Sequence, residues 1–187
     1  MSNYSCIVAK VDSVIAIPNA DRIQLGKVLG ESVVIAKSIE VGHVGLFFCT
    51  GTQLSEDFCK ANNLFRDKTK NSDPEKAGFF EDNRNVRAQP FLGCKSQGYF
   101  AELEALSFAG DVSKLKVGDK FEEFNKVGIC KKYENERQLR AKANNQTKAV
   151  KKNLVPQFKE HIETSQFKYC TNELQKGDLI SIQSKRH

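Results

Sequence analysis

The stretch IPNADRIQLGKVLGESVVIA, residues 17–36, decides the fold that this sequence predicts. Its Pro, Asn and Asp residues favour a reversal at the start, because Pro presets φ and the other two bond their own backbone. Residues 23–30 then alternate apolar with polar or small side chains, and residues 32–36 form a second apolar run just beyond a glycine. This pattern predicts a β-hairpin.

Short strands are expected on both sides of this hairpin. Alternating apolar residues predict a strand within residues 5–14, and two further strands over residues 86–93 and 98–103, joined by residues 94–97. A turn of glycine and a polar residue that launches a strand occurs three times, in VGHVGLFF (41–48), VGDKFEEF (117–124) and KGDLISI (176–182). Strands therefore dominate the predicted structure.

Helical patterns are few. Residues 55–65 have a capping-type start and apolar residues at helical spacing, which predicts one short helix. Residues 67–84 are polar and predict a long loop. Many short strands with glycine turns favour a mainly β fold with short helices, built as a closed or nearly closed barrel, and we expect that barrel to close near Phe124.

Length and hydropathy limit the possible classes of protein. A chain of 187 residues can form one compact domain and an incomplete second element. No apolar run approaches the roughly 18–20 residues that a membrane span needs. We therefore expect a cytoplasmic protein, or a nuclear one in a host with a nucleus, with no membrane partner, and we expect a monomer.

The six cysteines are scattered singly and form no Cys-x-x-Cys pair. This spacing argues against structural zinc and against a disulfide framework, and favours reduced thiols that pack as small apolar groups. The three histidines are far apart and lack acidic or thiol partners at diagnostic spacing. We expect no metal site formed by these residues, no hydrolase triad and no glycine-rich phosphate-binding loop.

Positive charge is concentrated in one segment. Between Lys131 and Lys152 there are eight basic and two acidic residues, an excess equal to the net charge of +6 of the whole chain. Such a segment favours contact with nucleic acid, although solvated linkers are often rich in lysine as well. Residues 131–153 contain few apolar side chains, so a helix and a disordered linker both fit, and we favour a mobile linker.

The order of several segments resembles RNA ligases that carry an N-terminal OB barrel followed by a nucleotidyltransferase domain. The resembling segments are IPNADRIQL (17–25), EVGHVGLFF (40–48), NVR (85–87), KSQG (95–98), GICKKY (128–133) and FKEHIET (158–164). The resemblance implies an OB-fold RNA-binding domain over residues 1–130, a basic linker over residues 131–155, and the start of a nucleotidyltransferase domain over residues 156–187.

The final residues KRH lie where such ligases carry motif I, a Lys-x-His-Gly or Lys-x-Asp-Gly sequence after a strand, whereas a basic tail is the alternative. The resemblance implies that Lys185 attacks the α-phosphate of ATP to form lysyl-AMP, with Mg²⁺ or Mn²⁺ neutralising phosphate charge. It also implies nucleotide contacts from His187 and Ser184. Many relatives carry Asp and Glu at these two positions, so these contacts differ from the usual pattern.

The remaining motifs of such ligases would lie beyond residue 187, so we expect this chain alone to be inactive in ligation. RNA capture is the role that it could perform alone, through a basic groove and aromatic platforms. Candidate cationic contacts to RNA are Arg87, Lys95, Lys131, Lys132, Arg137 and Arg140. Candidate stacking residues are Phe91, Tyr99 and Phe100, although aromatic residues in a barrel more often belong to the core.

Two other functions remain open. The segment PNADR also occurs in OB domains that bind tRNA, so a non-catalytic tRNA- or RNA-binding OB protein is the main alternative. A barrel that binds only protein is a third hypothesis, because OB folds host many functions. The salt dependence of RNA affinity separates this third hypothesis from the other two, since only phosphate contacts make affinity fall steeply with added salt.

Overall fold

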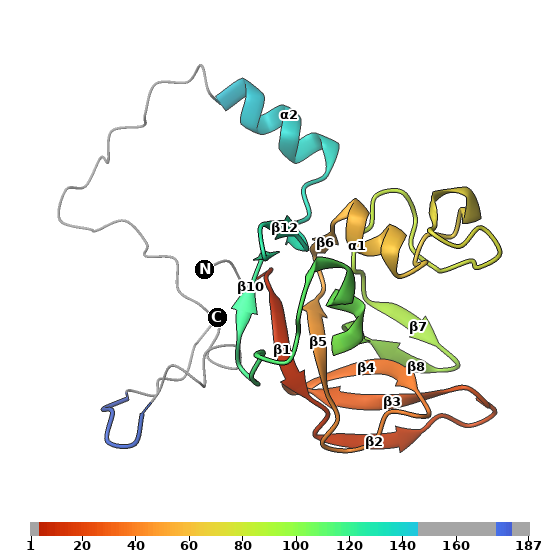
Figure 1. Ribbon diagram of the computed structural model, residues 1–187, viewed down its shortest axis with the longest axis vertical. Helices are drawn as coiled ribbons and strands as arrows, with labels where there is room; N and C mark the ends of the chain where they lie inside the picture. Colours follow the sequence, from red (N-terminus) through yellow and green to blue (C-terminus); the bar gives the residue numbers. More distant parts are fainter. Residues whose placement is uncertain (1–3, 146–174, 181–187) are drawn as a thin grey trace.

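The computed structural model describes residues 4–145 and 175–180. Strands dominate the described part and its helices are short, which confirms the expectation of a mainly β protein. Figure 1 shows the strands gathered in one body, with helix α2 (Glu136–Asn145) standing away from them. In the described ranges, no helix is long and apolar enough to cross a membrane.

The hairpin predicted from residues 17–36 is present. Strands β2 (Ser13–Ala16), β3 (Ile23–Val28) and β4 (Glu31–Ala36) form a three-stranded antiparallel sheet. Leu29 and Gly30 connect β3 to β4 with φ angles of 52° and 79°. This left-handed pair suits a two-residue hairpin turn, and glycine adopts such a conformation without steric cost.

A second antiparallel sheet forms the centre of the molecule. Its strands, in spatial order, are β10 (Lys120–Phe121), β1 (Cys6–Lys10), β5 (Val44–Cys49) and β9 (Gly98–Glu102). Both faces are buried: alternate residues of β1 and β5 contribute to two separate apolar clusters. This explains why the sequence of β5 is the nearly continuous apolar run VGLFFC rather than a strict alternation.

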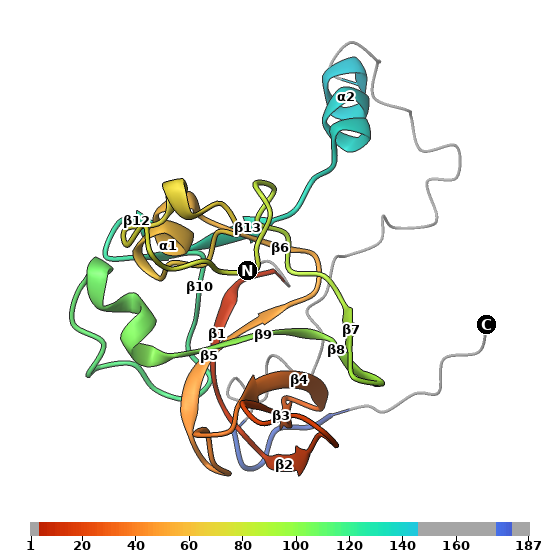
Figure 2. The ribbon, with the colours of Figure 1, turned by 90° about the vertical axis from the view of Figure 1, so that its right-hand side faces the viewer.

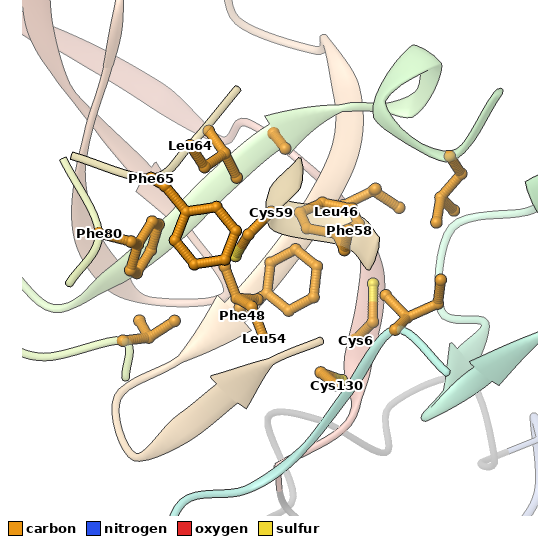
Figure 3. Packing of buried hydrophobic residues seen from close by; sticks show 14 of the residues in the cluster. Cys6, Leu46, Phe48, Leu54, Phe58, Cys59, Leu64, Phe65, Phe80 and Cys130 are labelled. Atoms are coloured by element: carbon orange, nitrogen blue, oxygen red, sulfur yellow. The ribbon is translucent and has the colours of Figure 1, made fainter. Parts of the chain in front are cut away.

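The two apolar clusters are covered by different elements. One contains Phe48 of β5, Phe58 and Cys59 of α1 (Glu56–Ala61), and Leu106 of the 3-10 helix η2 (Leu103–Ala109). Figure 3 shows the rings of Phe48 and Phe58 close together in this cluster. The other cluster lies between the central sheet and the β2-β3-β4 sheet (Figure 2). Each fully buried Phe contributes about 1.5–3 kcal/mol of hydrophobic stabilisation.

The short helix predicted from residues 55–65 is confirmed as α1. The Ser55 hydroxyl accepts a hydrogen bond of 3.1 Å from the Phe58 backbone N–H, which caps the helix. The helix ends at Asn62 and the next residue, Asn63, has a left-handed φ of 55°. Residues 67–84 form a loop, as expected, apart from the 3-10 turn η1 (Lys68–Lys70).

One predicted connection is wrong. Residues 94–97 were expected to join two strands, but strand β8 (Cys94–Ser96) lies there and pairs with β7 (Gln89–Phe91). The reversal occurs earlier, at Leu92 and Gly93, whose φ angles are 46° and 82°. Both residues adopt the left-handed conformation of a two-residue hairpin turn, and the sequence signal of Leu-Gly there is weak.

Closure of a barrel near Phe124 is also wrong. Strand β11 (Glu123–Phe124) pairs only with β12 (Val127–Gly128), and β6 (Thr52–Leu54) pairs with β13 (Cys130–Lys132). Within residues 4–145 and 175–180, the strand ladders form separate sheets and no closed barrel. Side-chain and loop hydrogen bonds link β4 to the β8–β9 segment instead: Ser32 O accepts 2.7 Å from Gln97 N, and Ser96 Oγ accepts 3.0 Å from Val34 N.

The preference for a mobile linker is wrong for residues 136–145, which form α2, so the helical alternative holds there. Its start is a reciprocal cap. The Asn135 side chain accepts 2.9 Å from the Gln138 N–H, and the Gln138 side chain accepts 3.0 Å from the Asn135 N–H. The rest of the predicted linker, residues 146–155, lies outside the described residues.

The third glycine turn of the sequence is present at residues 176–177, where the Asp178 backbone N–H donates 3.1 Å to Gln175 O. A strand was expected directly after it, but residues 178–180 belong to none. Residues 156–174 and 181–187 lie outside the described ranges, so the expected motif at Lys185 does too.

Candidate nucleic-acid interface

A groove of about 560 Å³ opens over β4, β9 and the β7–β8 hairpin. Its residues come from strands and loops that are distant in sequence: the end of β4, the loop of residues 79–87, β7 and β9. Figure 1 shows the β7–β8 hairpin beside β4, which forms this corner of the molecule. The volume is within the range of pockets that bind small organic groups.

Aromatic rings form one wall of the groove. Phe79 is 54% exposed and Phe91 is 38% exposed, whereas Phe80 and Phe100 are buried. Tyr99 packs against both Phe79 and Phe80, with its ring centroid 5.6 Å from that of Phe79 and 5.3 Å from that of Phe80. The exposed rings of Phe79 and Phe91 therefore offer surfaces for stacking a planar ligand.

The aromatic wall is anchored in the hydrophobic core. The ring of Tyr99 stacks on Phe48 at 5.9 Å, and Figure 3 shows Phe80 and Phe48 in the same buried cluster. Burial raises the pKa of the Tyr99 hydroxyl well above its usual value, with a smaller contribution from the nearby Cys59 thiol. Tyr99 thus stays protonated and acts as a wall of the groove rather than as an acid or base.

The loop that carries Phe79 is held by its own hydrogen bonds. The buried Asn71 side chain accepts 3.0 Å from Phe65 N and donates to Phe65 O and Lys76 O. Two exposed ion pairs, Arg66–Glu81 and Lys70–Asp82, close the loop at 2.5 and 2.6 Å, and each contributes at most about 1 kcal/mol. The position of Phe79 is therefore fixed mainly by Asn71 and by ring packing.

Gly78 makes the close approach of this loop possible. A Cβ atom at this position would lie 2.1 Å from the Leu64 carbonyl oxygen, so no other residue fits without moving the backbone. The Gly78 N–H donates 2.8 Å to Phe65 O. Sequence reasoning missed Phe79, and the signal that could have found it is the pair Phe79-Phe80 after a glycine in an otherwise polar stretch.

The charges of the side chains that line the groove sum to zero. Arg66 and Arg87 are opposed by Glu81 and Glu102. Arg66 is already paired with Glu81. The groove is therefore neutral overall, and it suits the bases of a nucleic acid better than the phosphates.

Uncharged polar residues complete the lining, among them Asn83, Asn85 and Gln89. The Asn85 side-chain oxygen Oδ1 is buried and has no hydrogen-bond partner in the described part of the chain. An unpartnered buried acceptor costs about 1–3 kcal/mol, so such a group calls for an explanation.

A row of residues connects the groove to the basic segment. Asn85 lies opposite Gln53 of β6, and Gln53 lies opposite Lys131 of β13. Neighbouring strands are about 4.8 Å apart, so the Lys131 backbone is roughly 10 Å from that of Asn85. A single strand of nucleic acid could contact both within one or two nucleotides.

The predicted cationic contacts divide into separate groups. Arg87 lines the groove, whereas Lys95 is exposed on β8 opposite Pro90 and outside the groove lining. Lys131 and Lys132 are exposed on β13, and the ammonium group of Lys132 lies 5.3 Å from the centre of the Tyr4 ring. The structure therefore does not gather all six predicted cations at one site.

The two remaining cations lie on α2. Arg137 is exposed, and Arg140 pairs with Glu136 one turn earlier at 3.1 Å. Lys142 pairs with Glu134, and this contact lowers the pKa of the Glu134 carboxyl. The acidic residues thus compensate part of the positive charge of this segment.

The predicted stacking residues also divide. Phe91 is exposed in the groove, but Phe100 is 6% exposed and packs into the core, and Tyr99 is mostly covered. The alternative that these rings belong to the core holds for Phe100 and largely for Tyr99. Lys185, Ser184 and His187, the expected nucleotide contacts, lie outside the described residues.

None of the five described cysteines forms a disulfide, and four of them are buried. Burial raises the pKa of the Cys59 thiol and of the Cys130 thiol to about 12, which suppresses the reactive thiolate. Among the described residues, no group of three or more His, Cys, Asp or Glu side chains could hold a metal ion.

No protein-family model matches this sequence, and none of the curated proteins matches it either. Among solved structures, the fold is similar to that of Naegleria gruberi RNA ligase with PPi, at 21% identity and a TM-score of 0.51. The match covers 70% of this chain and 35% of that chain. A mutant of the same ligase with ATP and Mn gives the same identity, coverage and TM-score. The chain thus has an RNA ligase-like fold and spans about a third of the length of these structures.

Proposed function

We propose that this chain is the N-terminal RNA-binding portion of an ATP-dependent RNA ligase that seals 5′-phosphate and 3′-hydroxyl RNA ends. The observation that carries the proposal is the neutral aromatic groove, which lies about two strands from the exposed Lys131 and Lys132. Stacking platforms beside a basic track are what proteins use to hold single-stranded nucleic acid. The ligase-like fold agrees with this role.

The strand order supports an OB-type RNA-binding domain over residues 1–130. Following the neighbours, β2 pairs with β3, β3 with β4, β4 is hydrogen-bonded to the β8–β9 segment, and β9 pairs with β5 and β5 with β1. This is the path of a five-stranded, partly open Greek-key barrel when β1 and β2 are taken as one bent strand. In the proposed organisation, residues 131–155 link this domain to the start of a nucleotidyltransferase domain at residues 156–187.

The chemistry proposed for the whole protein begins at Lys185. Its unprotonated amine attacks the α-phosphate of ATP, forming a phosphoramidate bond to AMP and releasing pyrophosphate. AMP then passes to the RNA 5′-phosphate, and attack by the 3′-hydroxyl forms the phosphodiester bond and releases AMP. Ser184 and His187 would contact the nucleotide, and Mg²⁺ or Mn²⁺ would neutralise phosphate charge.

The proposed setting is a cytoplasmic monomer that acts on RNA. The cysteines in the described part of the chain form no disulfide, which suits a reducing compartment. The alternative function, a non-catalytic tRNA- or RNA-binding OB protein, is favoured by the groove itself, because RNA binding there needs nothing from Lys185.

The proposal is tested by incubation with α-labelled ATP and a divalent metal. We compare this chain, a form that continues into a nucleotidyltransferase domain, and that longer form with Lys185→Ala. Acid-labile AMP on the longer form, absent from the variant, is the expected result. Equal labelling of the variant would remove Lys185 from the nucleophile role, and an unlabelled longer form that still binds RNA would establish the non-catalytic alternative.

A further inference from the structure

The Asn85 side chain differs from its neighbours in that its buried oxygen lacks a hydrogen-bond partner among the described residues. The adjacent polar groups are satisfied: Asn83 O accepts 2.9 Å from the Gln53 side chain, and Asn83 Oδ1 accepts 3.2 Å from the Asn85 N–H. The Arg84 Nε donates 3.1 Å to Leu54 O. Only the Asn85 Oδ1 atom remains buried without a partner within the described ranges. A hydrogen-bond donor brought by a ligand would satisfy it.

Asn85 is placed to meet such a ligand. Asn85 and its two neighbours, the buried Val86 and the exposed Arg87, all line the groove. Because Oδ1 is buried, a rotation about the terminal torsion of Asn85, which is broad and roughly two-fold, is required for Oδ1 to face a ligand in the groove.

Several side chains of the groove accept hydrogen bonds, and a donor on the ligand would match them. Besides Asn85, Glu81 and Glu102 line the groove, and carboxylates accept hydrogen bonds. Arg66 is engaged by Glu81 and offers less to an incoming acceptor. Adenine and cytosine carry an amino group at C6 and C4, where guanine and uracil carry a carbonyl oxygen, so adenine and cytosine complement these acceptors.

We propose that the groove holds one unstacked amino-bearing nucleobase, adenine or cytosine, against Phe79 and Phe91, with its amino group donating to Oδ1 of Asn85. This inference rests on the RNA binding proposed above and adds base selectivity to it. The sugar-phosphate backbone then passes toward Lys131, along the row that joins Asn85, Gln53 and Lys131. Single-stranded RNA is commonly read in this way, by stacking and by contacts to base edges.

The test measures binding of the full chain to fluorescent oligo(rU) strands of about 12 nucleotides, a length within the site size of OB-type modules. One strand carries a central adenosine, and the matched strand carries purine riboside, which replaces only the amino group by hydrogen. We expect the adenosine strand to bind roughly 5-fold more tightly, because the purine riboside strand lacks the one hydrogen bond to Asn85.

Asn85→Ala should abolish the difference in affinity between the two strands. Asn85→Asp keeps an acceptor oxygen and should retain the preference for the adenosine strand. This variant tests the proposal even if Asn85→Ala is unstable. Thermal unfolding of each variant separates altered recognition from altered folding.

The outcomes separate the two proposals. Equal affinity of the unaltered chain for both strands would overturn base selectivity while leaving RNA binding in place, as oligo(rU) affinity itself shows. A preference that persists in Asn85→Ala would overturn the role of Asn85. Failure to bind any strand would overturn the proposed function, and the inference with it.

Discussion

The groove over β4 and β9 and the basic segment of residues 131–142 differ in nearly every physical property. The groove is neutral, lined by aromatic rings and tied to the core through Tyr99 and Phe48. The basic segment is mostly exposed, includes the first seven residues of α2, and pairs part of its charge with Glu134 and Glu136. Affinity from the first should depend on stacking and hydrogen bonds, and affinity from the second on phosphate charge.

Positive charge in the sequence therefore does not indicate where the groove lies. The excess charge lies between Lys131 and Lys152, but the only cation of the six predicted contacts that lines the groove is Arg87. Charge attracts the polyanion over distances up to the Debye length, whereas selectivity depends on close contacts. The following experiments separate these two contributions.

The largest expected effect is on the alkylation rates of two buried thiols, one near each region. Cys59 contributes to the core behind the groove wall, and Cys130 is the first residue of β13, directly before the basic segment. Both have a pKa of about 12, against a reference of 9.0. At a pH below 9.0 the fraction of reactive thiolate falls about tenfold per pKa unit, so iodoacetamide should modify both about 10³-fold more slowly than an unshifted thiol.

Cys94, which is only partly buried on β8, is the internal control for this experiment, read by peptide mass mapping. Fast modification of Cys130 with slow modification of Cys59 would mean that the basic segment separates from the core. The same shifts set a pH dependence of stability. Because the folded pKa values are raised, their stabilisation is complete below pH 9.0 and is lost as pH rises toward about 12.

The next effect comes from the exposed rings of the groove. Phe79→Ala or Phe91→Ala should weaken binding to single-stranded RNA by about 1–3 kcal/mol, or roughly 5- to 150-fold, because one stacking surface is removed. The slope of log affinity against log salt should stay unchanged, since every phosphate contact is kept. Fluorescence anisotropy over a range of salt concentrations measures both quantities.

Phe108→Ala is the matched control for this prediction. Phe108 is 38% exposed, as is Phe91, but it packs on Phe58 at 6.2 Å and is not part of the groove lining. Its replacement should leave RNA affinity unchanged. An equal loss of affinity in Phe108→Ala and Phe91→Ala would show that the groove is not where stacking occurs.

Local signals explain how much of the fold the sequence predicted. The hairpin of β3 and β4 and the helix α1 were recognisable because alternation, a glycine turn and the Ser55 cap lie within a few residues of each other. The turn at Leu92-Gly93 was missed because Leu adopts a left-handed φ there, which its residue type does not favour. For α2, the scarcity of apolar residues led to the prediction of a mobile linker. The local signal for a helix is the reciprocal cap between Asn135 and Gln138.

The groove was less predictable than the fold, because it depends on contacts between distant segments. Arg87 and Phe91 were identified from the sequence, but Phe79 lies in a polar loop whose position depends on Asn71 and on ring packing with Tyr99. Asn85 was noted only as part of the resembling segment NVR (85–87), and its orphaned oxygen exists only once β6 and the loop are in place. Burial of a polar atom is a tertiary property that residue type does not reveal.

The smallest effect on affinity is expected from the basic segment. Replacing Lys131 and Lys132 together by Ala should reduce the salt slope by roughly 0.7 for each phosphate that is no longer neutralised, with a smaller decrease in affinity than in the groove variants. Lys132 also lies over the Tyr4 ring, so its replacement should lower stability by about 0.5–1 kcal/mol, measured by thermal unfolding. The preference for an amino-bearing base should persist, because the groove is untouched.

The matched control replaces the exposed Lys114 and Lys116, which changes net charge by the same amount at a site away from β13. If the salt slope depends on local phosphate contacts, it should fall only in the Lys131 and Lys132 variant. An equal fall in both variants would mean that the whole charge of +6 attracts RNA without a defined track. The groove alone would then set the path of the strand, since its stacking and hydrogen-bond contacts are the ones that require a fixed position.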